Sequence, residues 1–171
     1  MGSISRAQFL RGDLQGKLQV IRPPWAVDED HFTELCTRCS DCISACPTTI
    51  LKKGRGGFPE VDFGSGECDF CGECASSCKK EGALQCDIQG NEGSIGTPWL
   101  LKASIEKNCL PKKGIECRIC GEQCETRAIQ FRLTVGTVAQ PKLDDSSCTG
   151  CGACYRVCPD QAIEIAYSKA S

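Results

Sequence analysis

Cysteine is the residue type best placed to do chemistry in this chain, because 17 of its 171 residues are cysteines. Sixteen of them form four groups of four. Three groups have the spacing C-x2-C-x2-C-x3-C, and one has seven residues between its first two cysteines. In chain order the groups are Cys36, Cys39, Cys42 and Cys46; Cys68, Cys71, Cys74 and Cys78; Cys109, Cys117, Cys120 and Cys124; and Cys148, Cys151, Cys154 and Cys158.

This spacing is typical of loops that bind cubic 4Fe-4S clusters. Three cysteines two residues apart let one tight loop hold three corners of the cube, and the fourth ligand comes from elsewhere. A disulfide framework would not repeat the spacing four times in a chain without an export signal. Structural zinc prefers cysteine pairs or mixed Cys/His sets, and this chain has a single histidine. We therefore predict four 4Fe-4S clusters with the sixteen cysteines as their ligands.

The fourth ligand of each cluster is expected to come from the neighbouring group. In two-cluster ferredoxins the last cysteine of each run ligates the other cluster. Pairing group one with two, and three with four, predicts these ligand sets: Cys36, Cys39, Cys42 and Cys78; Cys68, Cys71, Cys74 and Cys46; Cys109, Cys117, Cys120 and Cys158; Cys148, Cys151, Cys154 and Cys124. Nested pairing, one with four and two with three, is the open alternative.

The two halves of the chain repeat one plan. Each reads as a cluster loop, a short helix, a two-strand hairpin and a second cluster loop. Glycine-rich turns predict the hairpins, over residues 50–62 in the first half and 128–144 in the second. The predicted fold is α+β, with two tandem bacterial 2x(4Fe-4S) ferredoxin-like domains that are small and stapled by their clusters.

The predicted domain organisation has four parts. Residues 1–30 form an N-terminal arm, 31–88 the first ferredoxin-like domain, 89–108 a linker of glycine-rich composition, and 109–171 the second domain. The insertion Leu110 to Glu116 is expected to bulge from the third cluster loop. Its Lys112 and Lys113 are interpreted as a solvated turn rather than a docking patch.

The remaining residues indicate no catalytic site. Six Phe, two Tyr and two Trp exclude a large aromatic core. No Ser/His/Asp set, carboxylate pair or phosphate-binding glycine loop is present, so the protein is expected to be no enzyme. Structural roles are predicted for the other notable residues: Cys86 as a buried thiol outside the clusters, Arg22 to Trp25 as a segment packed on its own chain, His31 as a surface residue, and Trp99 as hydrophobic packing.

Charge and hydropathy exclude several classes of partner. The net charge of −2 gives no basic nucleic-acid surface. Four oxidised clusters would lower that charge to about −10. No stretch approaches the roughly 20 apolar residues of a membrane span. The segment Ser5 to Arg11 is similar to a twin-arginine export motif, but Ala7 replaces the second arginine and no apolar run follows, so a cytoplasmic protein is expected.

Several motifs together resemble the NapF family, the cytoplasmic ferredoxin-type proteins of bacterial periplasmic nitrate reductase systems. They are Ser5 to Gly12, Ile21 to Trp25, the acidic Asp28 to Asp30, the first cysteine run, and the Cys109-x7-Cys117 spacing with Glu116 to Cys120. The resemblance implies four clusters on the sixteen cysteines. It also implies binding to the precursor form of the catalytic nitrate reductase subunit and a role in its maturation before export. The alternative is an electron-transfer polyferredoxin that relays electrons to a reductase.

Overall fold

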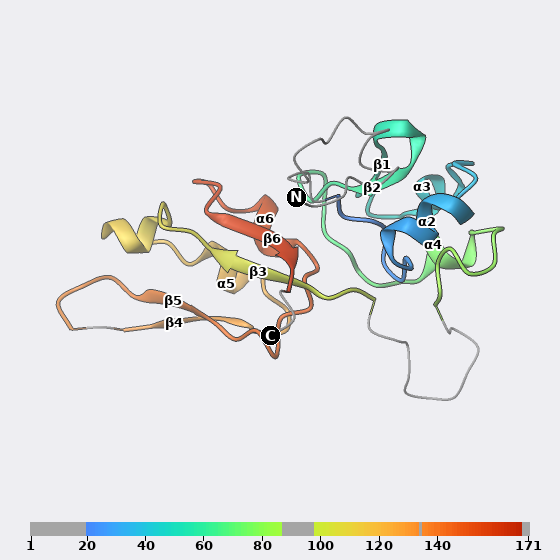
Figure 1. The fold of residues 1–171 in the computed structure, drawn as a ribbon. Helices are drawn as coiled ribbons and strands as arrows, with labels where there is room; N and C mark the ends of the chain where they lie inside the picture. Colours follow the sequence, from blue (N-terminus) through green and yellow to red (C-terminus); the bar gives the residue numbers. More distant parts are fainter. Residues whose placement is uncertain (1–19, 87–97, 134, 169–171) are drawn as a thin grey trace, which may run out of the picture. The chain divides into compact units, whose positions relative to one another are not determined.

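The computed structural model describes residues 20–86, 98–133 and 135–168, drawn as a ribbon in Figure 1. The chain divides into two compact units: Met1–Asp62 with Phe70–Trp99, and Phe63–Asp69 with Leu100–Ser171. Residues 1–19 of the predicted arm and residues 89–97 of the predicted linker fall outside the described residues, and the four-part domain organisation stays a prediction.

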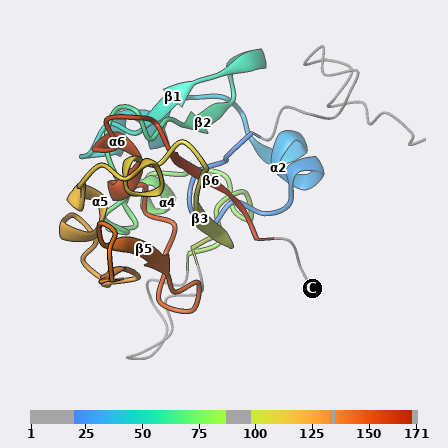
Figure 2. The ribbon, with the colours of Figure 1, turned by 90° about the vertical axis from the view of Figure 1, so that its left-hand side faces the viewer.

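Short helices and one hairpin make up the first unit. Its elements are α2 (Glu29–Leu35), α3 (Asp41–Ala45), β1 (Leu51–Lys53), η1 (Arg55–Gly57), β2 (Pro59–Val61) and α4 (Glu73–Ser76). Strands β1 and β2 are antiparallel, with Leu51 opposite Val61 (Figure 2). Between the two strands, Gly56 has φ of 65° and Gly57 has φ of 82°, and glycine adopts such positive angles without a steric penalty. The predicted first hairpin is confirmed.

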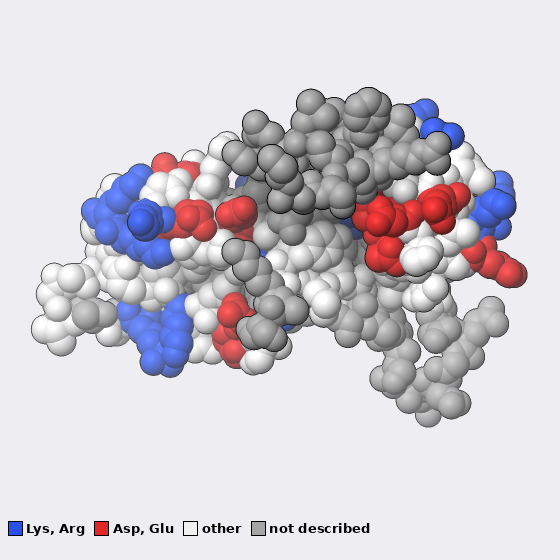
Figure 3. Space-filling model, in the orientation of Figure 1, with Lys and Arg blue, Asp and Glu red and all other residues white. Residues whose placement is uncertain are grey.

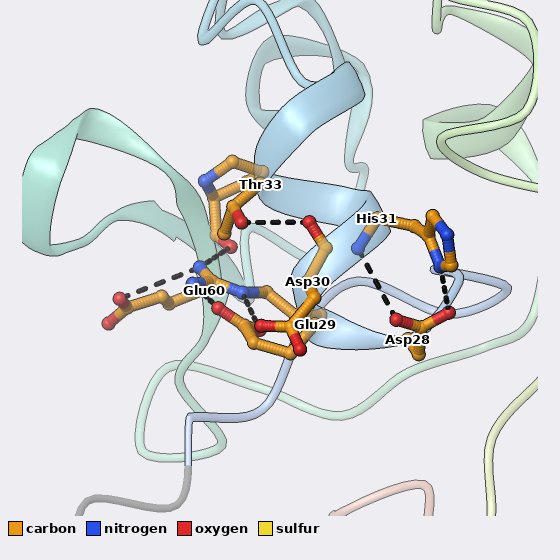
Figure 4. Close-up of polar contacts among 8 residues, drawn as sticks. Asp28, Glu29, Asp30, His31, Thr33 and Glu60 are labelled. Atoms are coloured by element: carbon orange, nitrogen blue, oxygen red, sulfur yellow. Dashed lines mark hydrogen bonds and ion pairs between the residues drawn. The ribbon is translucent and has the colours of Figure 1, made fainter. Parts of the chain in front are cut away.

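Helix α2 begins at a side-chain cap. A carboxylate oxygen of Asp28 accepts a hydrogen bond from the His31 backbone N–H at 3.3 Å, and the other lies 2.6 Å from His31 Nδ1 (Figure 4). Glu29 and Asp30 place negative charge in the first turn, where the helix dipole favours it. The inner face buries Phe32 almost completely. The His31 side chain is 71% exposed, which confirms it as a surface residue.

The segment from Arg22 to Trp25 is buried in the first unit, which confirms that it packs on its own chain. Arg22 is only 3% exposed and donates two hydrogen bonds to the Glu29 carboxylate, at 2.8 and 2.7 Å. Its third nitrogen donates to the Pro59 carbonyl at 3.0 Å and lies 3.6 Å from Glu60 Oε1. Glu29 on α2 and Glu60 on β2, both labelled in Figure 4, therefore share this guanidinium. Arg22 thus ties the N-terminal segment to both α2 and β2.

The second unit contains two antiparallel strand pairs. Its elements are β3 (Leu101–Ile105), η2 (Leu110–Lys113), α5 (Ile119–Glu122), β4 (Ile129–Arg132), β5 (Gln140–Leu143), α6 (Ala153–Arg156) and β6 (Ile163–Tyr167). β4 pairs with β5, as predicted, with Ile129 opposite Leu143. β3 pairs with β6 along its whole length, and the two strands lie side by side in Figures 1 and 2. This outer pair was not predicted.

Strand β3 lies within residues 89–108, for which the sequence predicts a linker. Leu101 and Ala103 are buried on one face of the strand, opposite Tyr167 and Ile165 of β6. The first unit repeats this outer pairing as a single bridge between Ala26 and Leu84. The internal repeat therefore extends beyond the hairpins to the ends of each unit.

Two glycines allow close packing around the fourth cysteine run. Gly150 has φ of 72°, and a Cβ there would lie 2.5 Å from the Leu101 carbonyl oxygen. Gly152 has φ of 92°, and a Cβ there would lie 2.0 Å from the Phe63 ring. Any larger residue would push the cysteine loop away from β3 and from Phe63. Residues 63–69 therefore pack within the second unit, where the Cys68 N–H donates to the Cys151 carbonyl at 2.8 Å.

Candidate functional site

The first thiol set, Cys36, Cys39, Cys42 and Cys78, lines one pocket in the first unit. Burial, together with the nearby thiolates of Cys36, Cys78 and Cys39, raises the pKa of Cys42 to about 11. Because the charges of three other thiolates act on it, the Cys42 sulfur lies close to all three. The structure thus brings the last cysteine of run two to the first three of run one, as the paired prediction requires.

Backbone geometry explains how the first loop wraps. Arg38 and Ser40 have φ of 60° and 70°, so the chain turns sharply on either side of Cys39. Helix α3 then begins and carries Cys42 inward, where it is buried, while Cys39 stays exposed. Cys46 follows the helix in an extended conformation and leaves the loop. This is why run one supplies three thiols to one site and a fourth elsewhere.

The third thiol set, Cys109, Cys117, Cys120 and Cys158, is assembled in the second unit. Burial, together with the neighbouring thiolates of Cys109, Cys158 and Cys117, raises the pKa of Cys120 to about 11. Of these four thiols, Cys109 and Cys120 are buried. The set is the one expected from the exchange of the last cysteines of runs three and four.

The seven-residue insertion of run three forms the 3-10 turn η2. Gly114 ends this turn with φ of 81°. Lys113 Nζ lies 2.6 Å from Asp160 Oδ2, and Lys112 Nζ donates to the Ile105 carbonyl at 2.6 Å. The lysines are thus held by their own chain, which agrees with the solvated-turn interpretation. The turn lets Cys117 return to Cys109 despite the insertion.

The fourth thiol set, Cys124, Cys148, Cys151 and Cys154, lies beside the third. Burial, together with the thiolates of Cys151, Cys148, Cys120 and Cys124, raises the pKa of Cys154 to about 12. Because Cys120 belongs to the third set, the two sites are neighbours within the second unit.

Hydrogen bonds favour a thiolate at Cys124. Burial opposes ionisation there, but the Thr126 hydroxyl and the N–H groups of Ile129, Ala128 and Thr126 outweigh it and lower the pKa. The Thr126 hydroxyl lies 3.5 Å from the Cys124 sulfur, and Thr48 lies 3.5 Å from Cys46 in the corresponding place of the first unit. The two exchanged cysteines therefore have the same local surroundings.

The second predicted set is divided between the units. Cys46, Cys71 and Cys74 belong to the first unit, and Cys68 to the second. Cys74 is buried, Cys71 exposed, and the other two half-buried. Their assembly into one site stays a prediction. Cys86 is half-buried, which makes it less enclosed than the buried thiol predicted from the sequence.

The three assembled sets fit the chemistry of a cube. Among the described residues, no three Cys, His, Asp or Glu side chains meet at the distances of a single bound metal ion. A 4Fe-4S cube holds its thiolates farther apart than one ion does, because each thiolate binds a different iron. A backbone donor is also in place, since the Ala162 N–H donates to Cys158 Sγ at 3.1 Å. Such bonds to sulfur help to set a reduction potential.

Two charged residues near the thiols were not predicted as parts of the sites. Burial raises the pKa of Cys36, and the Arg22 guanidinium opposes that shift. Lys102 Nζ donates to the Cys148 carbonyl at 2.6 Å. Neither residue lies in a cysteine run, so spacing gives no signal for them. An arginine in a segment with Pro and Trp, typical of buried packing, was the only hint for Arg22.

Two iron–sulfur family models match the parts of the chain that contain three of the four cysteine runs. The family described as "4Fe-4S dicluster domain" matches residues 31–79, and the family described as "4Fe-4S binding domain" matches residues 141–164. The predicted α+β iron–sulfur fold is thus confirmed, and so is 4Fe-4S binding. In the described part of the chain, no helix has the length and apolar character needed to cross a membrane.

Relatives extend the similarity over nearly the whole chain. The ferredoxin-type protein NapF of Escherichia coli (strain K12) is 40% identical over 168 residues, covering 95% of this chain and 94% of that protein. NapF of Haemophilus influenzae is 43% identical over 173 residues, with the same coverage of each. The ferredoxin-type protein NapG of E. coli (strain K12) is 30% identical over 155 residues, covering 81% of this chain and 65% of that protein. The chain belongs to the NapF family of ferredoxin-type iron–sulfur proteins, which confirms the predicted class of electron-transfer or accessory protein rather than enzyme.

Proposed function

We propose that this protein is a cytoplasmic accessory protein with four 4Fe-4S clusters that binds the precursor of the catalytic subunit of periplasmic nitrate reductase and assists its maturation before export. The observation that carries the proposal is membership of the NapF family over 95% of the chain. Three thiol sets assembled as predicted support the cluster count. The second set, Cys46, Cys68, Cys71 and Cys74, would complete the sixteen ligands.

The residues around each set would hold and tune a one-electron carrier. A 4Fe-4S cluster supplies reversible transfer of a single electron. Exchange of Cys124 and Cys158 between runs three and four would bring the two sites of the second unit side by side. The effects of Cys158 on the pKa of Cys120 and of Cys120 on the pKa of Cys154 support this. The Ala162 N–H donates to Cys158 Sγ, and each of the three assembled sets contains at least one buried thiol. This arrangement suits delivery of electrons to a client protein during its assembly.

A second function is an electron-transfer subunit that serves the mature reductase. The observation in its favour is that Cys39 is exposed, so a redox partner could approach the first set closely. Both functions use the same cysteines, and they differ in which form of the client is bound.

An anaerobic pull-down separates the two functions. The holo-protein is immobilised and offered the precursor of the catalytic subunit or its mature form, with an unrelated exported iron–sulfur precursor as the control. We expect at least tenfold greater capture of the nitrate reductase precursor, and nitrate reduction by mature enzyme that does not need this protein. Equal capture of both forms, together with a requirement during steady-state turnover, would contradict the maturation role.

A further inference from the structure

Three cations stand at the mouth of the pocket that the first thiol set lines. Arg38, Lys79 and Lys80 contribute to its wall together with the four cysteines, and all three are exposed. None of the described residues lining this pocket is acidic. The Lys79 side chain is 83% exposed even though Asp41 lies 2.8 Å from its Nζ. The lining of this pocket therefore includes three cations, one of them paired with Asp41, and no acidic residue among those described.

A fourth cation, Lys53, lies beside Arg38 of this group. A Cβ on Gly57 would lie 3.4 Å from Lys53 Cε and 3.7 Å from Arg38 Cδ, so both side chains flank that glycine. Arg38 is also held over the Phe58 ring at 5.3 Å. In Figure 3, basic and acidic side chains both reach the outer edge of the first unit, and a larger acidic group lies on the same face. The basic surface is thus local and partly ordered.

The charge of this surface is positive, whereas the net charge of the whole protein is negative. The chain carries a net charge of −2, and bound clusters would make it more negative. Clustered charge of one sign steers partners of the opposite sign and orients them before contact. Cys39 is exposed beneath these cations, so a partner docked there would come close to the first site.

We propose that Arg38, Lys53, Lys79 and Lys80 form a docking surface for an acidic electron-carrier protein, such as a reduced flavodoxin, that delivers electrons at the first thiol set. The proposal rests on cluster binding under the proposed function. In the transfer, one electron leaves the reduced flavin and one enters the oxidised cluster, and no bond forms or breaks. The docking surface would then be the electron entry point, separate from the surface that binds the client.

The test measures reduction of the anaerobic holo-protein by flavodoxin hydroquinone in a stopped-flow instrument. The test variant is Arg38→Gln/Lys79→Gln/Lys80→Gln. The matched control removes three exposed cations of the second unit, as Lys107→Gln/Arg132→Gln/Lys142→Gln. We expect the fastest phase to slow about tenfold at low salt in the test variant and less than about twofold in the control. The rate of the test variant should also depend less on salt.

A second reductant shows whether the cluster itself is intact. Photoreduced deazaflavin, a small reductant that needs no protein docking, should reduce the test variant and the wild type at equal rates, and both should retain the same iron content. Equal slowing of test and control variants by flavodoxin would overturn the proposal. So would an unchanged flavodoxin rate with weakened capture of the nitrate reductase precursor, which would assign the surface to the client. Failed precursor capture by wild type, with the tenfold effect intact, would refute only the maturation role.

Discussion

Removal of the clusters is expected to unfold both units. A chelator with a mild anaerobic oxidant would release the iron and leave sixteen free ligands. In the part of the chain that the structure describes, the helices have at most seven residues and the strands at most five. Helices this short are not stable alone in water. The buried residues include five predicted cluster ligands, so the clusters would hold part of the core together: Cys42, Cys74, Cys109, Cys120 and Cys154. Metal-binding free energy is thus folding free energy.

Far-ultraviolet circular dichroism and limited proteolysis measure this effect. The apo-protein should lose its cooperative thermal transition and be digested within the β3–β6 pair, and reconstitution with iron and sulfide should restore both properties. Cys86→Ala serves as the control, because Cys86 lies outside the predicted sets and its holo-protein should behave as wild type. An apo-protein with an unchanged melting temperature would contradict the view that the clusters hold the fold.

Replacing the buried arginine is expected to have the second large effect. Arg22→Met leaves Glu29 and Glu60 without their shared cation. It also removes the contacts that the guanidinium makes 5.4 Å over the Phe32 and Phe58 rings. Breaking a buried ion pair by removing one partner costs about 3–5 kcal/mol. Because Glu29 and Glu60 keep 32% and 26% of their exposure, water can partly solvate them, and we expect a loss of about 2–4 kcal/mol.

Lys52→Met is the matched control in the same unit. Lys52 pairs with Asp62, and both side chains are about half exposed. An exposed pair of this kind contributes at most about 1 kcal/mol. Anaerobic hydrogen exchange of the α2 and β2 amides should report a large loss of protection for Arg22→Met and a small one for Lys52→Met. Equal protection in the two variants would show that the buried arginine stabilises the fold no more than a surface lysine.

The cysteine spacing predicted the sites better than it predicted the fold around them. Ligand geometry forces three cysteines onto one loop, so three of the four thiol sets could be anticipated from spacing and the exchange rule. The two hairpins followed from glycine-rich turns between short apolar segments. These are local features, and local rules are enough to predict them.

The long-range contacts could not be predicted in the same way. Strand β3 has only two buried residues, Leu101 and Ala103, and follows a segment of loop-like composition. Its partner β6 lies some 60 residues later in the chain, and no short pattern reports such pairing. The contacts of Arg22 with Glu29 and Glu60 also depend on how α2 and β2 pack, which the residue types alone do not specify.

Counting iron in double variants tests the exchange of cysteines between runs most directly. Cys39→Ala and Cys78→Ala should each lower the iron content from about sixteen to about twelve atoms, because each removes a ligand of one cluster. In the exchanged arrangement Cys39 and Cys78 hold the same cluster. The double variant Cys39→Ala/Cys78→Ala should therefore also retain about twelve atoms, while Cys71→Ala/Cys78→Ala should retain about eight. The reverse result, about eight for the first double variant and about twelve for the second, would mean that each run holds its own cluster and would contradict the account.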